Sequence, residues 1–166
     1  DSVAGARPAV QLLTPGARWG EDHTRIELQP PHFERLTAIM PLERDASGLL
    51  VFTQDPRLLR RMREEATRLE QEFIVEVAGE IAPYGLRRLE HGLSFNGRAL
   101  PPIKVSWQNE IRLRFALKGV QDGQLQSMCA DVGLQVVAMR RIRIGRVPLA
   151  KVPAGQWRYL PTNEKL

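Results

Sequence analysis

The sequence predicts an α+β fold with a mixed, mostly antiparallel central sheet and flanking helices. Two patterns indicate this fold: strand-like apolar runs outnumber amphipathic helical stretches, and turn signals such as Asn96-Gly97 join neighbouring strands as hairpins. The 166 residues are 43% hydrophobic, which is enough for one domain with a sizeable core. We expect a loop-rich N-terminal segment with a first strand in residues 1–34, the main domain in residues 35–160 and a tail in residues 161–166.

Strands are expected wherever apolar, often β-branched residues run together or alternate with polar ones. Between residues 111 and 117, for example, Leu113 and Phe115 should face the core, whereas Arg112 and Arg114 should face the other way. The expected strands cover residues 10–13, 48–53, 72–77, 103–107, 111–117, 134–139 and 141–144.

Helices are expected in three places where apolar residues recur at helical spacing. Asp55-Pro56 is typical of a helix start, with Asp as the cap and Pro at the first position. This helix should cover residues 57–69 and pack on the central sheet. A short helix is expected over residues 86–93, and a third helix should follow Asp122 as its cap.

The chain is basic and rich in arginine. Lys and Arg number 24 against 19 Asp and Glu, which gives a formal net charge of +5. Only four of the basic residues are lysines, which leaves 20 arginines. Guanidinium groups match phosphates and stack on bases, so this composition favours a nucleic-acid partner. A general preference for Arg at surface positions would produce the same composition, so the arginines alone do not decide between the two.

Several classes of protein are excluded by composition. No apolar run approaches the roughly 18–20 residues that cross a bilayer, so we expect no membrane partner. A single cysteine, Cys129, cannot form an internal disulfide and indicates a cytoplasmic location. Cys129 lies in an apolar helical stripe and is expected in the core. Cys129 and the three scattered histidines do not form a set of zinc ligands, so we expect no metal site. We also expect the chain to be a monomer.

Three motifs along the chain carry a resemblance to one family. Residues 41–49 read Pro-Leu-Glu-Arg-Asp-Ala-Ser-Gly-Leu and are followed by Thr-Gln-Asp at residues 53–55. Residues 139–145 and 153–160 hold two further motifs. Together they resemble bacterial ribosomal-RNA pseudouridine synthases, in the branch that usually carries a small N-terminal RNA-binding domain. The resemblance implies that family's catalytic-domain fold for residues 35–160. It also implies isomerisation of uridine to pseudouridine in rRNA, with no cofactor.

The same resemblance marks functional positions, and several of these carry other residues here. The catalytic Asp of the family corresponds to Glu43, and the Arg two residues before it corresponds to Pro41. A Lys-x-Tyr strand, whose Tyr stacks on the target base in the family, has Gln71 and Phe73 in those places. The helix that the family writes as Arg-Gln-Ile-Arg-Arg-Met corresponds to residues 123–128, which contain no arginine.

Two carboxylates are candidates for catalysis. Glu43 stands at the position of the family Asp, and Asp45 is the second candidate because a strand-like segment would place it on the same face as Glu43. Glu43 has one methylene more than Asp, and misplacement of a reacting group by ~1 Å can cost about a hundredfold in rate. The alternative interpretation is a pair of solvated loop carboxylates.

RNA contact is expected from an aromatic ring and a set of arginines beside the family's cleft. Phe73 offers a stacking face, and Arg44 lies between the two candidate carboxylates. The strand arginines expected to contact RNA are Arg112, Arg114, Arg140, Arg141, Arg143 and Arg146. The alternative is that these arginines pair with acidic residues of neighbouring strands.

Three functions are therefore compatible with the sequence. The first is an rRNA pseudouridine synthase that uses Glu43 as its carboxylate. The second is a non-catalytic RNA- or ribosome-binding pseudoenzyme on the same fold, which the missing Asp, Tyr and Arg favour. The third is an unrelated binding module that reuses the scaffold. RNA, and rRNA in particular, is the expected partner under the first two.

Overall fold

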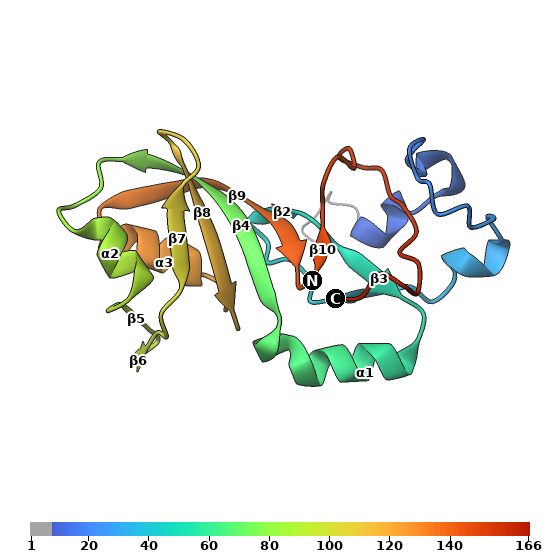
Figure 1. The fold of residues 1–166 in the computed structure, drawn as a ribbon, viewed down its shortest axis with the longest axis horizontal. Helices are drawn as coiled ribbons and strands as arrows, with labels where there is room; N and C mark the ends of the chain where they lie inside the picture. The colour runs from blue at the N-terminus through green and yellow to red at the C-terminus, as the bar shows by residue number, and fades with distance from the viewer. Residues whose placement is uncertain (1–7) are drawn as a thin grey trace.

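The computed structural model describes residues 8–166 and has the expected α+β fold around one six-stranded sheet (Figure 1). Its strands are β2 (Ala46–Gly48), β4 (Glu70–Gly79), β7 (Lys104–Trp107), β8 (Arg112–Lys118), β9 (Leu134–Ile144) and β10 (Val147–Pro148). β10, β9, β4, β8 and β7 lie side by side in that order, and β2 pairs with β9. Within this sheet only β2 and β9 pair in parallel, so the sheet is mixed and mostly antiparallel, as predicted.

The hydrophobic core lies between one face of this sheet and two helices, α2 (Gly85–Glu90) and α3 (Gln124–Asp131). Every second residue of β4 from Gln71 to Val77 is buried, which is the alternation expected of a strand with one covered face. Cys129 of α3 lies in the core as expected, and burial raises the pKa of its thiol to about 12. Other buried members of the core are Val75, Leu89, Leu113, Phe115, Leu125 and Met128.

A second, smaller sheet lies beside the first and carries a helix (Figure 1). β1 (Thr37–Ile39) pairs antiparallel with β3 (Val51–Thr53), and α1 (Pro56–Glu65) contacts both strands. The buried side chain of Met62 lies on the inner face of α1. The expected helix therefore packs on this small sheet, and the prediction that it packs on the central sheet is wrong.

The start of α1 follows the predicted capping pattern. The Oδ1 atom of Asp55 accepts a hydrogen bond from the backbone N–H of Arg57 at 2.9 Å, and Pro56 occupies the first position. After Glu65 the chain tightens into a 3-10 turn, η4 (Ala66–Arg68), which leads directly into β4. The helical segment is therefore as long as predicted, but its last turn is not α-helical.

Residues 48–53 do not form one strand of the central sheet, contrary to expectation. Gly48 ends β2, and Val51 begins β3 in the small sheet. Gly48 has a φ of +105°, outside the range of a regular strand, and its Cα lies against the backbone of Arg141. This conformation turns the chain out of the central sheet, so an apolar run of six residues serves two sheets.

The strand expected at residues 10–13 is also wrong. Residues 9–12 form a 3-10 helix, η1 (Ala9–Leu12), and η2 (Pro15–Ala17) and η3 (Pro30–Phe33) follow. Proline at the start of η2 and η3 favours such turns because its ring fixes φ and removes the N–H. The first strand of the described residues is β1, which begins after the expected segment boundary at residue 34.

The remaining elements agree with the prediction except in their ends. The hairpin at Asn96-Gly97 is confirmed by the pairing of β5 (Ser94–Phe95) with β6 (Arg98–Ala99). β9 runs as one strand where two were expected. The helix α3 is present, but Asp122 is not its cap.

The C-terminal segment returns to the N-terminal one and is held there by aromatic side chains (Figure 1). Trp157 accepts a hydrogen bond from the backbone N–H of Trp19 at 2.7 Å, and its ring Nε1–H donates to the carbonyl of Thr14 at 2.7 Å. The guanidinium of Arg18 lies 4.7 Å above the ring of Tyr159. Trp157 and Tyr159 therefore hold the C-terminal segment against the N-terminal one.

The carboxylate of Asp22 accepts a hydrogen bond from the backbone N–H of Tyr159, and its contribution to the stability of the fold can be tested. Burial raises the pKa of its carboxyl, but hydrogen bonds from Thr24, the backbone of Tyr159 and Arg18 outweigh burial and hold the pKa well below its usual range. We expect Asp22→Asn to lower the free energy of unfolding by about 2 kcal/mol near neutral pH. A depressed pKa stabilises the folded state above the unfolded value of 3.8, so this difference should shrink as the pH falls below 3.8. Urea denaturation at several pH values measures it, and a difference independent of pH would contradict the assignment.

Gly48 gives a test of the chain's exit from β2. In Gly48→Ala the new Cβ would overlap the carbonyl oxygen of Arg141, and φ is unfavourable at +105°. Gly97→Ala is the matched control, because its φ is +77° but its Cβ would meet no atom within 4 Å. We expect a loss of about 1 kcal/mol for Gly97→Ala and at least about 3 kcal/mol for Gly48→Ala in chemical denaturation. Equal losses would show that the contact with Arg141 is unimportant.

Candidate functional site

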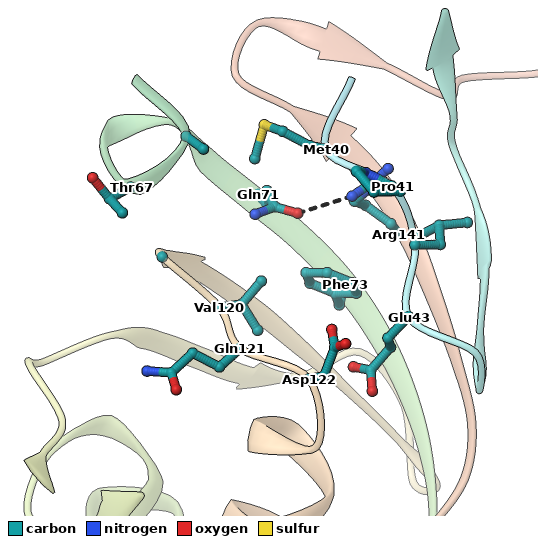
Figure 2. A pocket seen from close by; sticks show the side chains of 13 residues that line it. Met40, Pro41, Glu43, Thr67, Gln71, Phe73, Val120, Gln121, Asp122 and Arg141 are labelled. Carbon is teal, nitrogen blue, oxygen red and sulfur yellow. Dashed lines mark hydrogen bonds between the residues drawn. The ribbon is translucent and has the colours of Figure 1, made fainter. Parts of the chain in front are cut away.

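A cavity of about 300 Å³ opens between the loop before β2, the turn η4, the loop from β8 to α3, and the strands β4 and β9 (Figure 2). Its volume is at the lower end of the range of roughly 300–1,000 Å³ that small-ligand sites occupy. The polar and aromatic residues of its lining include Glu43, Gln71, Phe73, Asp122 and Arg141, and Pro41 lines it as well.

The cavity brings together positions that the resemblance marks. Pro41, Glu43, Gln71 and Phe73 lie in two separate segments of the chain, and all four line it. Gln71 and Phe73 belong to the buried face of β4, and Phe73 stands in register with Arg141 of β9. This convergence makes the cavity the candidate functional site.

Glu43 is held by neutral hydrogen-bond donors. Its Oε2 atom accepts from the backbone N–H of Gly123 at 3.1 Å and from the side-chain amide of Gln126 at 3.2 Å. Gly123 immediately precedes α3, so the carboxylate lies at the positive end of that helix. Within residues 8–166 Glu43 forms no ion pair with Lys or Arg. The carboxylate is therefore positioned by α3 without a cationic partner.

Two residues of this site were missed by the sequence analysis. Gln126 holds Glu43 from a position where the family's helix motif has arginine, so the motif alignment contained the signal. The Oε1 atom of Gln126 is buried and has no hydrogen-bond partner among the described residues. Asp122, expected as a helix cap, lines the cavity instead, and Figure 2 shows its carboxylate near that of Glu43, with both below Phe73.

Arg141 is a buried cation in the wall of the cavity, with 2% of its surface exposed. Its Nε and Nη2 atoms donate to the carbonyl of Leu49 at 3.1 and 2.8 Å, and Nη1 donates to Oε1 of Gln71 at 3.1 Å, the bond drawn in Figure 2. Burial lowers the pKa of its guanidinium to about 10, so the group stays charged at neutral pH. Arg141 therefore connects the loop after β2 to Gln71 of β4, which lines the cavity.

Arg44 and Asp45 lie outside the cavity. They form a turn closed by a hydrogen bond from the backbone N–H of Ala46 to the carbonyl of Glu43 at 3.1 Å. Both side chains are exposed, and neither is part of the lining. The segment is a turn and not strand-like at this point, so the expectation that Asp45 shares the face of Glu43 is wrong.

Four of the strand arginines expected beside the cleft lie on the other face of the central sheet. Arg141 shares the face of Phe73, whereas Arg112, Arg114, Arg140 and Arg143 stand in register with residues of β4 that face away from the core. The predicted alternation within each strand is confirmed. The sequence did not show that the cavity opens on the side of the buried residues.

Three of these arginines are ion-paired with glutamates of β4. The pairs are Arg112–Glu76 at 2.6 Å, Arg114–Glu72 at 3.0 Å, Arg143–Glu70 at 2.5 Å and Arg143–Glu72 at 2.8 Å. Arg114 in particular, together with Arg143, holds the pKa of the Glu72 carboxyl below its usual range. Pairing with neighbouring strands, the alternative from the sequence, therefore describes Arg112, Arg114 and Arg143. Their role in RNA binding stays a prediction.

The polar groups that a ligand would meet in the cavity are carboxylates, side-chain amides and the guanidinium of Arg141. Across residues 8–166, no three His, Cys, Asp or Glu side chains are grouped as ligands of a metal ion. In the same part of the chain, no helix combines the length and the apolar character needed to cross a membrane.

The arrangement of strands and helices is the fold of the pseudouridine synthases. A solved pseudouridylate synthase matches 82% of this chain and 60% of its own with a TM-score of 0.71 at 21% sequence identity, a likeness that shows the fold. No family model matches the chain.

By sequence the chain is a homologue of bacterial rRNA pseudouridine synthases. It is 30% identical over 163 residues to ribosomal large subunit pseudouridine synthase B of Escherichia coli, covering 95% of this chain and 56% of the relative. It is 28% identical over 133 residues to the dual-specificity RNA pseudouridine synthase RluF of the same organism, covering 80% of this chain and 46% of the relative. The chain thus spans about half the length of the curated relatives it matches.

The contact between Glu43 and α3 can be tested through stability. Removing the carboxylate in Glu43→Ala leaves the N–H of Gly123 and the amide of Gln126 without this acceptor. We expect the free energy of unfolding to fall by about 1 kcal/mol, as for the loss of a helix cap. Asp45→Ala is the control, since Asp45 is exposed, and should change it by less than about 0.5 kcal/mol. Thermal denaturation of both variants measures this, and an unaffected Glu43→Ala would contradict it.

Proposed function

We propose that the chain is an RNA-binding protein on a pseudouridine synthase scaffold, which holds an unstacked nucleotide of rRNA in its cavity without isomerising it. The relatives are named for action on RNA and on the large ribosomal subunit, which supports RNA as the partner. The net charge of +5 supports it as well. The proposal places the chain in the cytoplasm as a monomer that needs neither metal nor cofactor.

The observation that carries the proposal is the set of groups around Glu43. Pseudouridine formation, as the resemblance implies it, breaks the bond from base to sugar, turns the uracil and rejoins it through carbon. An Asp carboxylate aimed by an arginine performs this step in the family. Here the carboxylate is one methylene longer and accepts hydrogen bonds from Gly123 and Gln126, which are neutral. Its position at the start of α3 is that of a structural acceptor.

The other changed positions support binding without turnover. Phe73 lines the cavity and can stack on a base, but it has no hydroxyl for proton transfer. Pro41 lines the cavity too and can donate neither from its side chain nor from its backbone nitrogen. A flipped nucleotide needs a stacking surface and a pocket of its own size, and both are present. The groups needed for chemistry are changed together.

An active pseudouridine synthase is the second candidate. It is favoured by the placement of Glu43, whose carboxylate lines the cavity below the ring of Phe73 (Figure 2). In this alternative the amide of Gln126 takes over the aiming of the carboxylate. The two candidates differ in one measurable quantity, the turnover of uridine.

A tritium-release assay on rRNA transcripts distinguishes them. We expect the unaltered chain to bind the transcripts at ~50 mM salt, with affinity falling steeply as salt is added, and to release no tritium above background. Turnover that is lost in Glu43→Gln and kept in Asp45→Asn would establish the enzyme instead. Absence of any RNA binding would remove both candidates.

Restoring the family's groups tests why turnover is absent. The nucleophile, the group that aims it and the aromatic hydroxyl act as a unit, so the effects of restoring them one at a time on the rate do not add up. Glu43→Asp alone, and Glu43→Asp with Phe73→Tyr, should therefore stay inactive. Adding Gln126→Arg, which places a guanidinium where the amide now reaches residue 43, should give measurable tritium release. Activity in Glu43→Asp alone would show that side-chain length was the whole defect.

A further inference from the structure

The outer face of α1 is a continuous arginine surface. Arg57, Arg60 and Arg61 recur with Glu64 at the i, i+3, i+4 and i+7 spacing that defines one side of a helix, and Arg63 flanks them. All five side chains are exposed. The opposite side of the helix is the apolar one, where Met62 is buried. Four positive charges and one negative charge therefore face solvent along about 15 Å of helix.

Within the described residues these arginines have no acidic partner, unlike Arg112, Arg114 and Arg143 of the central sheet. Within residues 8–166 the ion pairs involve arginines of β8, β9 and the terminal segments, and none involves an arginine of α1. Glu64 and Glu65 of the same helix pair with none of them. The positive charge of α1 is thus available to a ligand, whereas the charges of Arg112, Arg114 and Arg143 are neutralised by glutamates of β4.

The arginine surface adjoins the cavity. α1 continues without a break into η4, and Ala66 and Thr67 of that turn line the cavity wall. Arg63 precedes this wall by three residues, less than one helical turn. A shallow hollow of about 420 Å³ also opens on α1 itself, and Arg60 and Arg63 line it with Pro56, Leu59 and Glu64. The path from the cavity along the helix is therefore positively charged.

The cavity cannot itself provide strong attraction for phosphates. It contains the carboxylates of Glu43 and Asp122, and its one guanidinium, Arg141, already gives hydrogen bonds to Leu49 and Gln71. A nucleotide in the cavity would place its base against Phe73 and leave its phosphodiester chain outside. Attraction for that chain must come from a cationic surface next to the opening.

We infer that the outer face of α1 binds the phosphodiester backbone of the RNA strand whose nucleotide enters the cavity. The inference rests on the proposed function and identifies the surface that supplies its affinity. Arginine suits this role because its planar fork donates two hydrogen bonds to one phosphate. Contacts to phosphates carry no sequence information, so α1 sets affinity and position while the cavity receives the base.

A pair of triple variants tests the inference. The first is Arg57→Gln with Arg60→Gln and Arg61→Gln. The control is Arg87→Gln with Arg88→Gln and Arg98→Gln, which removes the same charge from exposed positions on α2 and β6, in the left half of Figure 1 and away from α1. Binding of a fluorescently labelled rRNA stem–loop is measured by anisotropy over a range of salt concentrations.

We expect the α1 variant to bind at least about tenfold more weakly at ~50 mM salt, with a salt slope smaller by about two to three counterions. The control should lose less than about threefold. Equal losses in both variants would mean that only total charge matters, and an unaffected α1 variant would mean that RNA docks elsewhere; either result overturns the inference while the proposed function stands. If the unaltered chain binds no RNA, the proposed function itself fails and the inference fails with it.

A second measurement uses the unaltered chain and so does not depend on how the variants fold. Phenylglyoxal modifies accessible guanidinium groups, and mass spectrometry locates the modified residues. Bound RNA should protect Arg57, Arg60 and Arg61 and leave Arg87 and Arg88 reactive. If phosphatidylserine vesicles protect the α1 arginines and RNA does not, α1 is a lipid-binding surface and the inference is wrong.

Discussion

The buried guanidinium of Arg141 joins the loop after β2 to Gln71 of β4 in the wall of the cavity, and the geometry of the cavity depends on that connection. Its side chain donates to the carbonyl of Leu49 and to Gln71, while its backbone carbonyl accepts from the N–H of Leu49 and lies against Gly48. A charge buried at 2% exposure cannot lose these acceptors without a large desolvation penalty. The loop between the two sheets is therefore fixed, and Glu43, just before β2, is fixed with it.

Glu43 shows how the start of a helix can hold a carboxylate in place. The start of an α-helix presents unpaired N–H groups and a partial positive charge, and a carboxylate placed there is stabilised by both. Glu43 accepts from Gly123 at this point, so it supplies what Asp122 was expected to supply. A helix end can hold a carboxylate without a cation, which explains how the fold tolerates Gln126 in place of arginine.

One residue type occupies three environments in this chain, and the environments decide what each arginine can do. Arg141 is buried and structural, Arg114 is paired with Glu72 of the neighbouring strand, and Arg60 is exposed and has no acidic partner among residues 8–166. The pattern follows from β4, whose outward glutamates pair with Arg112 and Arg114 on one side and with Arg143 on the other. α1 packs on the small sheet, and within the part of the chain that the structure describes its arginines form no ion pair with those glutamates.

The sequence by itself determined the features that depend on neighbouring residues: the mixed sheet, the alternation along β4 and β8, the capped start of α1 and the β5–β6 hairpin. It also marked Glu43 and Phe73, because motif residues lie close together along the chain. Only the tertiary structure decided that residues 48–53 serve two sheets, that Arg114 faces away from the cavity, and that Gln126 reaches Glu43 from 83 residues away. Local patterns depend on backbone geometry and burial within a few residues, whereas these three outcomes depend on how separate elements pack, which no short-range pattern encodes.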